Sequence, residues 1–128
     1  MKQSGAGLVD NMFEDMRCVI TARLFREEKC FGPGIAELLE GIEELKSLRA
    51  AAMRMGMAYS KAWRIIHECE EKLGFRLLYS STGGRGGGGA EVTPEGKKLL
   101  SRFRTLEKEL NKTADTLLQA WREEDANL

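Results

Sequence analysis

Apolar side chains recur at helical spacing along this 128-residue chain. The first stripe lies in residues 34–46 and consists of Ile35, Leu38, Leu39, Ile42 and Leu45. This spacing predicts a helix with one buried face, and the break Gly32-Pro33-Gly34 precedes it.

Two further helices are predicted after it. One covers residues 48–55, with Ser47 as its N-cap and Gly56 ending it. The next begins at Tyr59 or Ser60 and runs to Lys72, with an inward face of Ala62, Ile65, Ile66, Cys69 and Leu73. The connecting turn has the short length of a helix-turn-helix, so the later helix is the expected recognition helix.

Two short extended runs follow, Leu77 to Tyr79 and Ala90 to Val92. The segment between them is rich in glycine and carries the cation Arg85. It is not a Walker phosphate loop, because no Gly-Lys-Ser or Gly-Lys-Thr follows. As a domain linker it would join runs too short to be separate domains. A β-hairpin with a basic tip fits better, since glycine allows close backbone approach. Helix, strand, basic tip, strand, helix is the order of a DNA-binding winged helix.

The last helix is expected to begin after Thr93 as N-cap, with Pro94 at its first position. Its apolar stripe is close to a heptad pattern and comprises Leu99, Phe103, Leu106, Leu110, Thr113, Leu117 and Trp121. Two interpretations are open: a helix packed on its own domain, or a dimerisation helix. We expect the early part to pack on the core and the rest to pair with a second chain. The expected dimer contacts are Phe103, Leu106, Leu110, Leu117 and Trp121.

The N-terminal part is less regular. Residues 1–15 are expected to form a frayed or weakly helical arm, and the β-branched and aromatic run Cys18 to Phe25 is expected to be a strand. The predicted organisation is thus an arm (1–15), a winged helix-turn-helix domain (16–96) and a C-terminal dimerisation helix (97–128). The fold class is mostly α (α+β), with a β-hairpin wing.

The composition is that of an ordinary globular protein, with 42% hydrophobic and 31% charged residues. No apolar run approaches the roughly 20 residues of a membrane span, and no signal peptide is evident, so no membrane association is expected. The three cysteines show no CxxC spacing, which favours free thiols in a reducing cytoplasm. With one histidine and no nucleophile, paired-carboxylate, metal-ligand or cofactor motif, we expect no enzyme activity, no metal and no cofactor.

The formal net charge of zero conceals an uneven distribution. Residues 46–87 carry eight Lys or Arg side chains and three Glu side chains, whereas residues 1–45 carry five basic and nine acidic ones. A basic excess across the helix-turn-helix and wing favours contact with phosphates, although a charge block alone is also typical of a solvated face.

The expected DNA contacts are Arg49, Tyr59, Ser60, Lys61, Arg64 and Arg85. Lys61 and Arg64 lie about one turn apart on the outer face of the recognition helix, where they would approach base edges or flanking phosphates. Ser60 either binds a phosphate or caps the helix. Trp63 borders the apolar face and is expected to be a half-buried support for this helix, while His67 is expected to be peripheral.

Three stretches carry a family resemblance. Residues 50–63, 73–78 and 92–100 are similar to the winged helix of LysR-type regulators. The closer resemblance is to the N-terminal DNA-binding domain of the ModE-type, molybdate-responsive regulators. It rests on F-G-P-G at 31–34, the turn and helix at 59–63, and above all T-G-G-R-G-G-G-G-A at 82–90. It covers about Val19 to Leu110.

The resemblance implies a dimeric bacterial or archaeal transcription regulator that binds palindromic operator DNA. The chain departs from the family pattern at Ala58, where a capping Ser is common, and at Ser80, where Arg is common. It ends at Leu128 without the family's oxyanion-binding domains, so molybdate sensing is not expected within this chain. The predicted function is a homodimeric transcription regulator that binds double-stranded DNA. The alternative is a winged-helix module that uses its long apolar helix to bind another protein.

Overall fold

The computed structural model describes residues 13–80 and 89–126. The described residues fall into two compact units, one made of residues 22–104 and one made of residues 13–21 with 105–126. Each unit is considered separately below. None of the described helices combines the length and apolarity that a bilayer-spanning helix needs.

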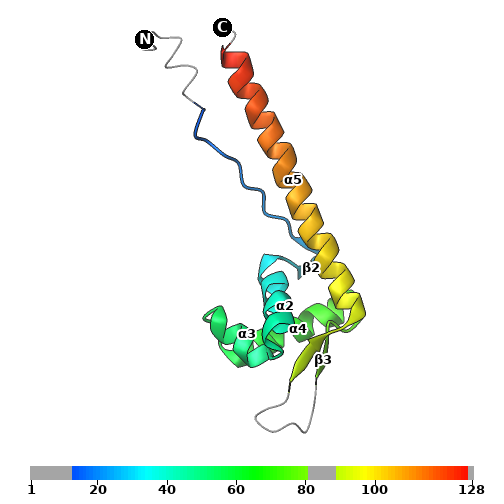
Figure 1. The fold of residues 1–128 in the computed structure, drawn as a ribbon. Coiled ribbons are helices and arrows are strands. Elements are labelled where there is room, and N and C mark those ends of the chain that lie inside the picture. The colour runs from blue at the N-terminus through cyan, green and yellow to red at the C-terminus, as the bar shows by residue number, and fades with distance from the viewer. Residues whose placement is uncertain (1–12, 81–88, 127–128) are drawn as a thin grey trace. The chain divides into compact units, whose positions relative to one another are not determined.

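The fold is mostly helical, as expected, and from α2 onward the elements follow the predicted order, whereas β2 was not predicted (Figure 1). In chain order they are β1 (Leu24–Arg26), β2 (Glu28–Phe31), α2 (Pro33–Leu45), α3 (Leu48–Arg54), α4 (Tyr59–Leu73), β3 (Leu78–Ser80), β4 (Ala90–Val92) and α5 (Pro94–Ala126). The strands form two separate antiparallel hairpins, β1 with β2 and β3 with β4.

The predicted strand over Cys18 to Phe25 is wrong in extent. Only the end of that run enters β1, and the strand pairs with β2 through a turn in which Glu27 has φ 69°. The residues before β1 have no partner strand among the described residues. Instead, in the second unit, the N–H and the carbonyl of Ile20 both form hydrogen bonds with the side-chain amide of Asn111. β-Branched residues favour extended backbone, but a strand also needs a neighbouring strand to satisfy its N–H and C=O groups.

Local end signals set the helix boundaries much as predicted. The Ser47 hydroxyl accepts a hydrogen bond from the N–H of Ala50 at 3.0 Å, so it caps α3. Gly56, with φ 69°, follows that helix, and Gly74, with φ 85°, ends α4. The Thr93 hydroxyl accepts from the N–H of Gly96 at 2.9 Å and caps α5.

The core of the first unit lies among α2, α3, α4 and the start of α5. Four residues of the predicted α2 stripe face it, while Leu45, the last of the stripe, is largely exposed. Small residues let α2 and α3 approach closely, since a Cβ placed on Gly41 would lie 2.8 Å from the Cβ of Ala51. Phe103, at 1% exposure, packs edge-to-face on Phe31 with ring centroids 5.1 Å apart. Phe103 is therefore a core residue, and its predicted role as a dimer contact is wrong.

The second unit consists of an irregular N-terminal segment packed along the later part of α5. The N–H of Ile20 donates to Asn111 Oδ1 at 2.8 Å. Arg122 Nε donates to the carbonyl of Phe13 at 2.8 Å, and its Nη2 donates to the carbonyl of Met16. The Phe13 ring also meets Trp121 edge-on, at 5.9 Å between centroids. Side chains of the helix thus hold the main chain of the segment.

Candidate nucleic-acid interface

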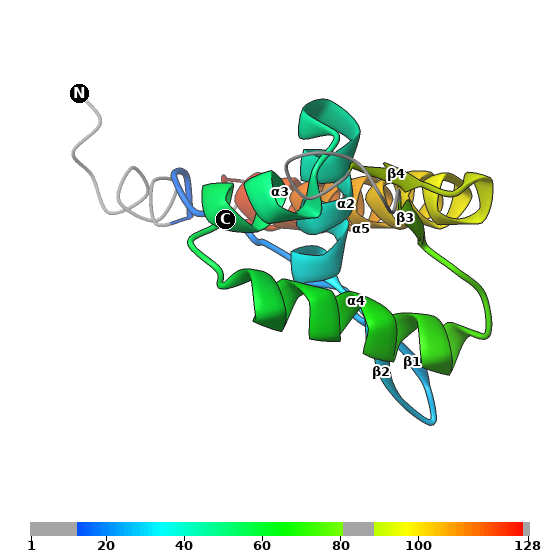
Figure 2. The ribbon, with the colours of Figure 1, turned by 90° about the horizontal axis from the view of Figure 1, so that it is seen from below.

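Helix α4 presents one apolar and one polar face. The apolar face consists of Ala62, Ile66 and Cys69, which share one side of the helix because they recur at helical spacing. All three side chains are buried in the core of the first unit. The opposite face is open to solvent along its length, and Figure 2 shows α4 in the foreground of the view from below. A helix held from behind in this way can enter the major groove without disturbing the core.

The predicted contacts on α4 lie on this open face. Ser60 and Lys61 are exposed, and their side chains form no hydrogen bond or ion pair with any described residue. Arg64 is also exposed, and its Nη1 lies 4.0 Å from the carboxylate of Glu68. Such an exposed pair contributes little energy, so the guanidinium can leave it for another acceptor at little cost.

The turn between α3 and α4 brings two further predicted residues together. The guanidinium of Arg49, on α3, lies over the ring of Tyr59, the first residue of α4, at 4.2 Å from the centroid. Cation–π contact holds the cation at the N-terminal end of the recognition helix. Ala58 provides no side-chain cap for α4, which agrees with its departure from the family pattern.

The Trp63 side chain is half-buried, as predicted, and its ring is stacked on a neighbouring side chain of α4. Its side chain is 48% exposed and stacks on His67, with ring centroids 3.7 Å apart and planes inclined by 17°. His67 Nδ1 donates to the carbonyl oxygen of Trp63 at 2.8 Å. The stacking on His67 was not predicted, because helical spacing alone cannot say which way a large ring at the border of the apolar face turns.

Sequence reasoning missed Glu70, which fixes the root of the wing. This buried carboxylate accepts the N–H of Leu77 at 2.7 Å and the N–H of Leu78 at 3.1 Å. Arg76 Nε lies 3.5 Å from the same oxygen. The available signal was an acidic residue four positions after Ile66, on the inward side of α4.

Of the wing, the structure describes the two strands β3 and β4. Leu78 pairs with Val92 and Ser80 with Ala90, in the antiparallel register of a hairpin. The Thr93 hydroxyl donates to the carbonyl of Arg76 at 2.7 Å and so ties the second strand to the start of the first. Arg85, the predicted wing contact, lies outside the described residues.

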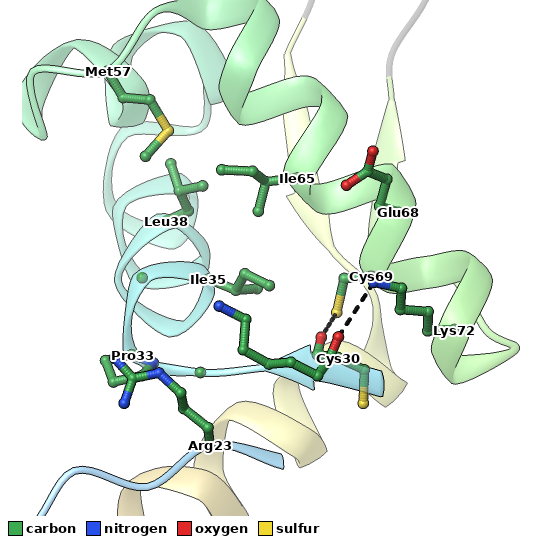
Figure 3. Close-up of a pocket in the computed structure, with 13 residues that line it drawn as sticks. Arg23, Cys30, Pro33, Ile35, Leu38, Met57, Ile65, Glu68, Cys69 and Lys72 are labelled. Atoms are coloured by element: carbon green, nitrogen blue, oxygen red, sulfur yellow. Dashed lines mark hydrogen bonds between the residues drawn. The ribbon is translucent and has the colours of Figure 1, made fainter. Parts of the chain in front are cut away.

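A pocket of about 320 Å³ lies on the other flank of α4 (Figure 3). Ile35, Leu38 and Met57 give it apolar walls, and the thiol of Cys69 donates to the carbonyl of Cys30 beside it. Burial raises the pKa of the Cys69 thiol to about 12, so it stays protonated at neutral pH and is a poor nucleophile. No group of side chains suited to hold a metal ion occurs within the described ranges.

Comparison with the sequences of known proteins also identifies the α3–turn–α4 region as a helix-turn-helix. Residues 36–97 match the family of bacterial regulatory helix-turn-helix proteins of the lysR family. The match runs from α2 to the start of α5 and so contains every described residue that is a candidate DNA contact. The matched family is regulatory, which agrees with the expectation of a DNA-binding protein rather than an enzyme.

Two curated relatives are identical to the chain at about a third of the aligned positions. The molybdenum-pterin-binding protein MopB of Rhodobacter capsulatus is 32% identical over 94 residues, which are 73% of this chain and 35% of MopB. The DNA-binding transcriptional dual regulator ModE of Escherichia coli K12 is 32% identical over 103 residues, which are 80% of this chain and 39% of ModE. The matched region is thus well under half the length of either relative.

Two solved structures share the fold. The crystal structure of the CbnR_DBD-DNA complex covers 68% of this chain and 94% of its own, with a TM-score of 0.52 and 23% identity. That of the BenM_DBD/benA site 1 DNA complex covers 68% and 92%, with a TM-score of 0.50 and 22% identity. Residues 36–97 therefore form a LysR-type helix-turn-helix domain, and over this region the chain is a distant homologue of ModE.

Proposed function

We propose that this protein is a transcription regulator that binds operator DNA as a homodimer. The observation that carries the proposal is the outer face of α4, where Ser60, Lys61 and Arg64 are exposed within a helix-turn-helix domain. Ser60 and Lys61 have no partner in the described part of the chain. Unpaired polar and basic side chains on a recognition helix match the phosphates and base edges of the major groove.

Each residue has a distinct role in this mode of binding. Lys61 and Arg64 reach base edges from the first two turns of α4. Arg49, held on the Tyr59 ring at the helix start, contacts the flanking phosphates. Arg85, placed between the two wing strands by its sequence position, is assigned to the DNA backbone.

The proposed dimer uses the later part of α5. Leu106, Leu110, Leu117 and Trp121 are all exposed there, at a spacing close to a heptad repeat. A two-fold pair of such helices buries four large apolar side chains from each copy. It also presents two recognition helices, which palindromic operators require.

The test starts with selection of bound duplexes from a random library, followed by fluorescence anisotropy titrations over a range of salt concentrations. We expect Lys61→Ala or Arg64→Ala to weaken binding by about 1–3 kcal/mol and to blur base preference. Arg85→Ala should weaken binding to all sequences alike and reduce the salt slope. Lys98→Ala, an exposed cation on α5, is the matched control and should bind as the parent protein does.

The opposite result would favour a different function. If the parent protein binds no duplex at low salt, yet forms a stable complex with one other protein, it is a winged-helix interaction module. In that case the substitutions on α4 would leave the complex unchanged, whereas Leu117→Asp on the apolar stripe would disrupt it.

A further inference from the structure

The exposed indole of Trp63 has no place in the contacts assigned so far. An aromatic ring of this size offers about 150–250 Å² of surface for burial, and nearly half of it remains in water here. The ring lies next to Arg64 along the helix facing the proposed groove. Single exposed apolar side chains are common on protein surfaces. This one differs because its ring is stacked on His67 beside the cation Arg64.

His67 holds this ring in a fixed orientation. The two rings are stacked nearly parallel, and His67 is itself held by its hydrogen bond to the carbonyl oxygen of Trp63. The hydrogen bond runs from one turn of α4 to the turn before it, so it costs no distortion of the helix. The indole is therefore preorganised, and less conformational entropy is lost when it docks on a partner.

The charge around Trp63 identifies which part of DNA it meets. The indole lines a surface hollow of about 690 Å³ between α4 and the wing root, together with Glu68, Glu71, Phe75 and Arg76. Two exposed carboxylates repel phosphates, so the sugar-phosphate backbone is a poor occupant of this side of the helix. The base edges remain, and the apolar group that the major groove presents is the C5-methyl of thymine.

We propose that Trp63 reads thymine, by packing its indole on the C5-methyl group of one thymine in each half-site. The proposal rests on the DNA binding proposed above. His67 acts as a positioning residue, since it touches the indole and not the base. Trp63 thereby adds a sequence preference that the cations Lys61 and Arg64 do not supply at that position.

Uracil provides a direct test, because deoxyuridine differs from thymidine only by this methyl group. Each thymine of a selected duplex is replaced in turn by deoxyuridine, and binding is measured by anisotropy at one salt concentration. Burying one methyl group corresponds to about a fourfold change in affinity. We expect the parent protein to lose about that factor at one position in each half-site and little elsewhere.

The variants then assign the effect to the ring. Trp63→Ala should bind the thymine and deoxyuridine duplexes equally, and Trp63→Phe should keep part of the difference. His67→Ala should retain Trp63 but reduce the discrimination, because the ring is no longer held. Lys61→Ala should bind more weakly to both duplexes while keeping their ratio.

The outcomes separate the two proposals. If the parent protein binds selected duplexes but no deoxyuridine substitution weakens it, Trp63 does not read a methyl group and the DNA-binding function still stands. The same conclusion follows if Trp63→Ala keeps the full discrimination. If the parent protein binds no duplex at all, both proposals fail together.

Discussion

Replacing Glu70 by alanine should loosen the junction between the recognition helix and the wing. The Glu70 side chain is 7% exposed, and one of its oxygens accepts both the Leu77 and the Leu78 N–H groups. Each buried donor left without an acceptor costs about 1–3 kcal/mol. The Arg76 side chain beside these two N–H groups is largely exposed, so water can reach them from that side. For the two donors together we therefore expect a loss in the lower half of the range, about 3 kcal/mol of unfolding free energy.

Glutamine at this position separates hydrogen bonding from charge. Both bonds end on the same oxygen, so the single amide oxygen of Glu70→Gln can accept both. We expect a loss of only about 1 kcal/mol, because a neutral acceptor bonds less strongly than a charged one. Glu71→Ala is the matched control, since that neighbouring side chain is exposed, and it should cost no more than about 0.5 kcal/mol.

Urea unfolding followed by circular dichroism measures these differences, and hydrogen exchange of the two amides locates them. The Leu77 and Leu78 amides should exchange faster in Glu70→Ala than in Glu70→Gln, with little change in the centre of α2. The reasoning is refuted if Glu70→Ala is within 1 kcal/mol of Glu71→Ala. It is also refuted if the alanine and glutamine variants are equally unstable.

Three further predictions concern the packing and the ion pairs of the first unit. Gly41→Ala should lower the free energy of unfolding by about 1–2 kcal/mol, because the new Cβ would lie 2.8 Å from that of Ala51. This clash should outweigh the better helix propensity of alanine. Thermal unfolding measures the change, and a variant more stable than the parent would contradict the prediction. Phe103→Ala should cost about 3–5 kcal/mol in urea unfolding, whereas a dimer contact would show a loss that depends on protein concentration. The hydrogen bonds from the Arg104 guanidinium hold the pKa of the Glu40 carboxyl below its usual value, so the pair stabilises the fold at neutral pH and the contribution disappears as the pH falls through the lowered pKa. Glu40→Gln should therefore cost less than about 1 kcal/mol at pH 7, and the difference from the parent should shrink as the pH is lowered and vanish once Glu40 is protonated.

The parts of the fold that local signals encode were predictable. Ser47 and Thr93 cap the helices that follow them, and Gly56 and Gly74 take the left-handed conformation that ends a helix. The β4 strand lies where its extended run placed it. These features depend on neighbouring residues in the chain, so the sequence alone contains the information.

The parts that depend on distant contacts were not predictable. Cys18 to Phe25 has the residues of a strand, but over most of its length no partner strand lies beside it in the described part of the chain. Phe103 fits a heptad pattern equally well as a core or as a dimer residue, and only the position of Phe31 decides between them. The candidate contacts on α4 were located by periodicity, whereas the stacking of Trp63 on His67 depends on ring orientations that periodicity does not contain.

The way the N-terminal segment is held in the second unit has a consequence for the history of this sequence. Asn111 and Arg122 bond to main-chain atoms of Ile20, Phe13 and Met16. Every residue except proline offers the same main-chain donor and acceptor, so most substitutions at Ile20 and Met16 leave these bonds intact. Substitution of either helix residue removes them. Apart from Phe13, whose ring packs on Trp121, the bonded positions of the segment can therefore diverge among descendants of this gene more freely than Asn111 and Arg122.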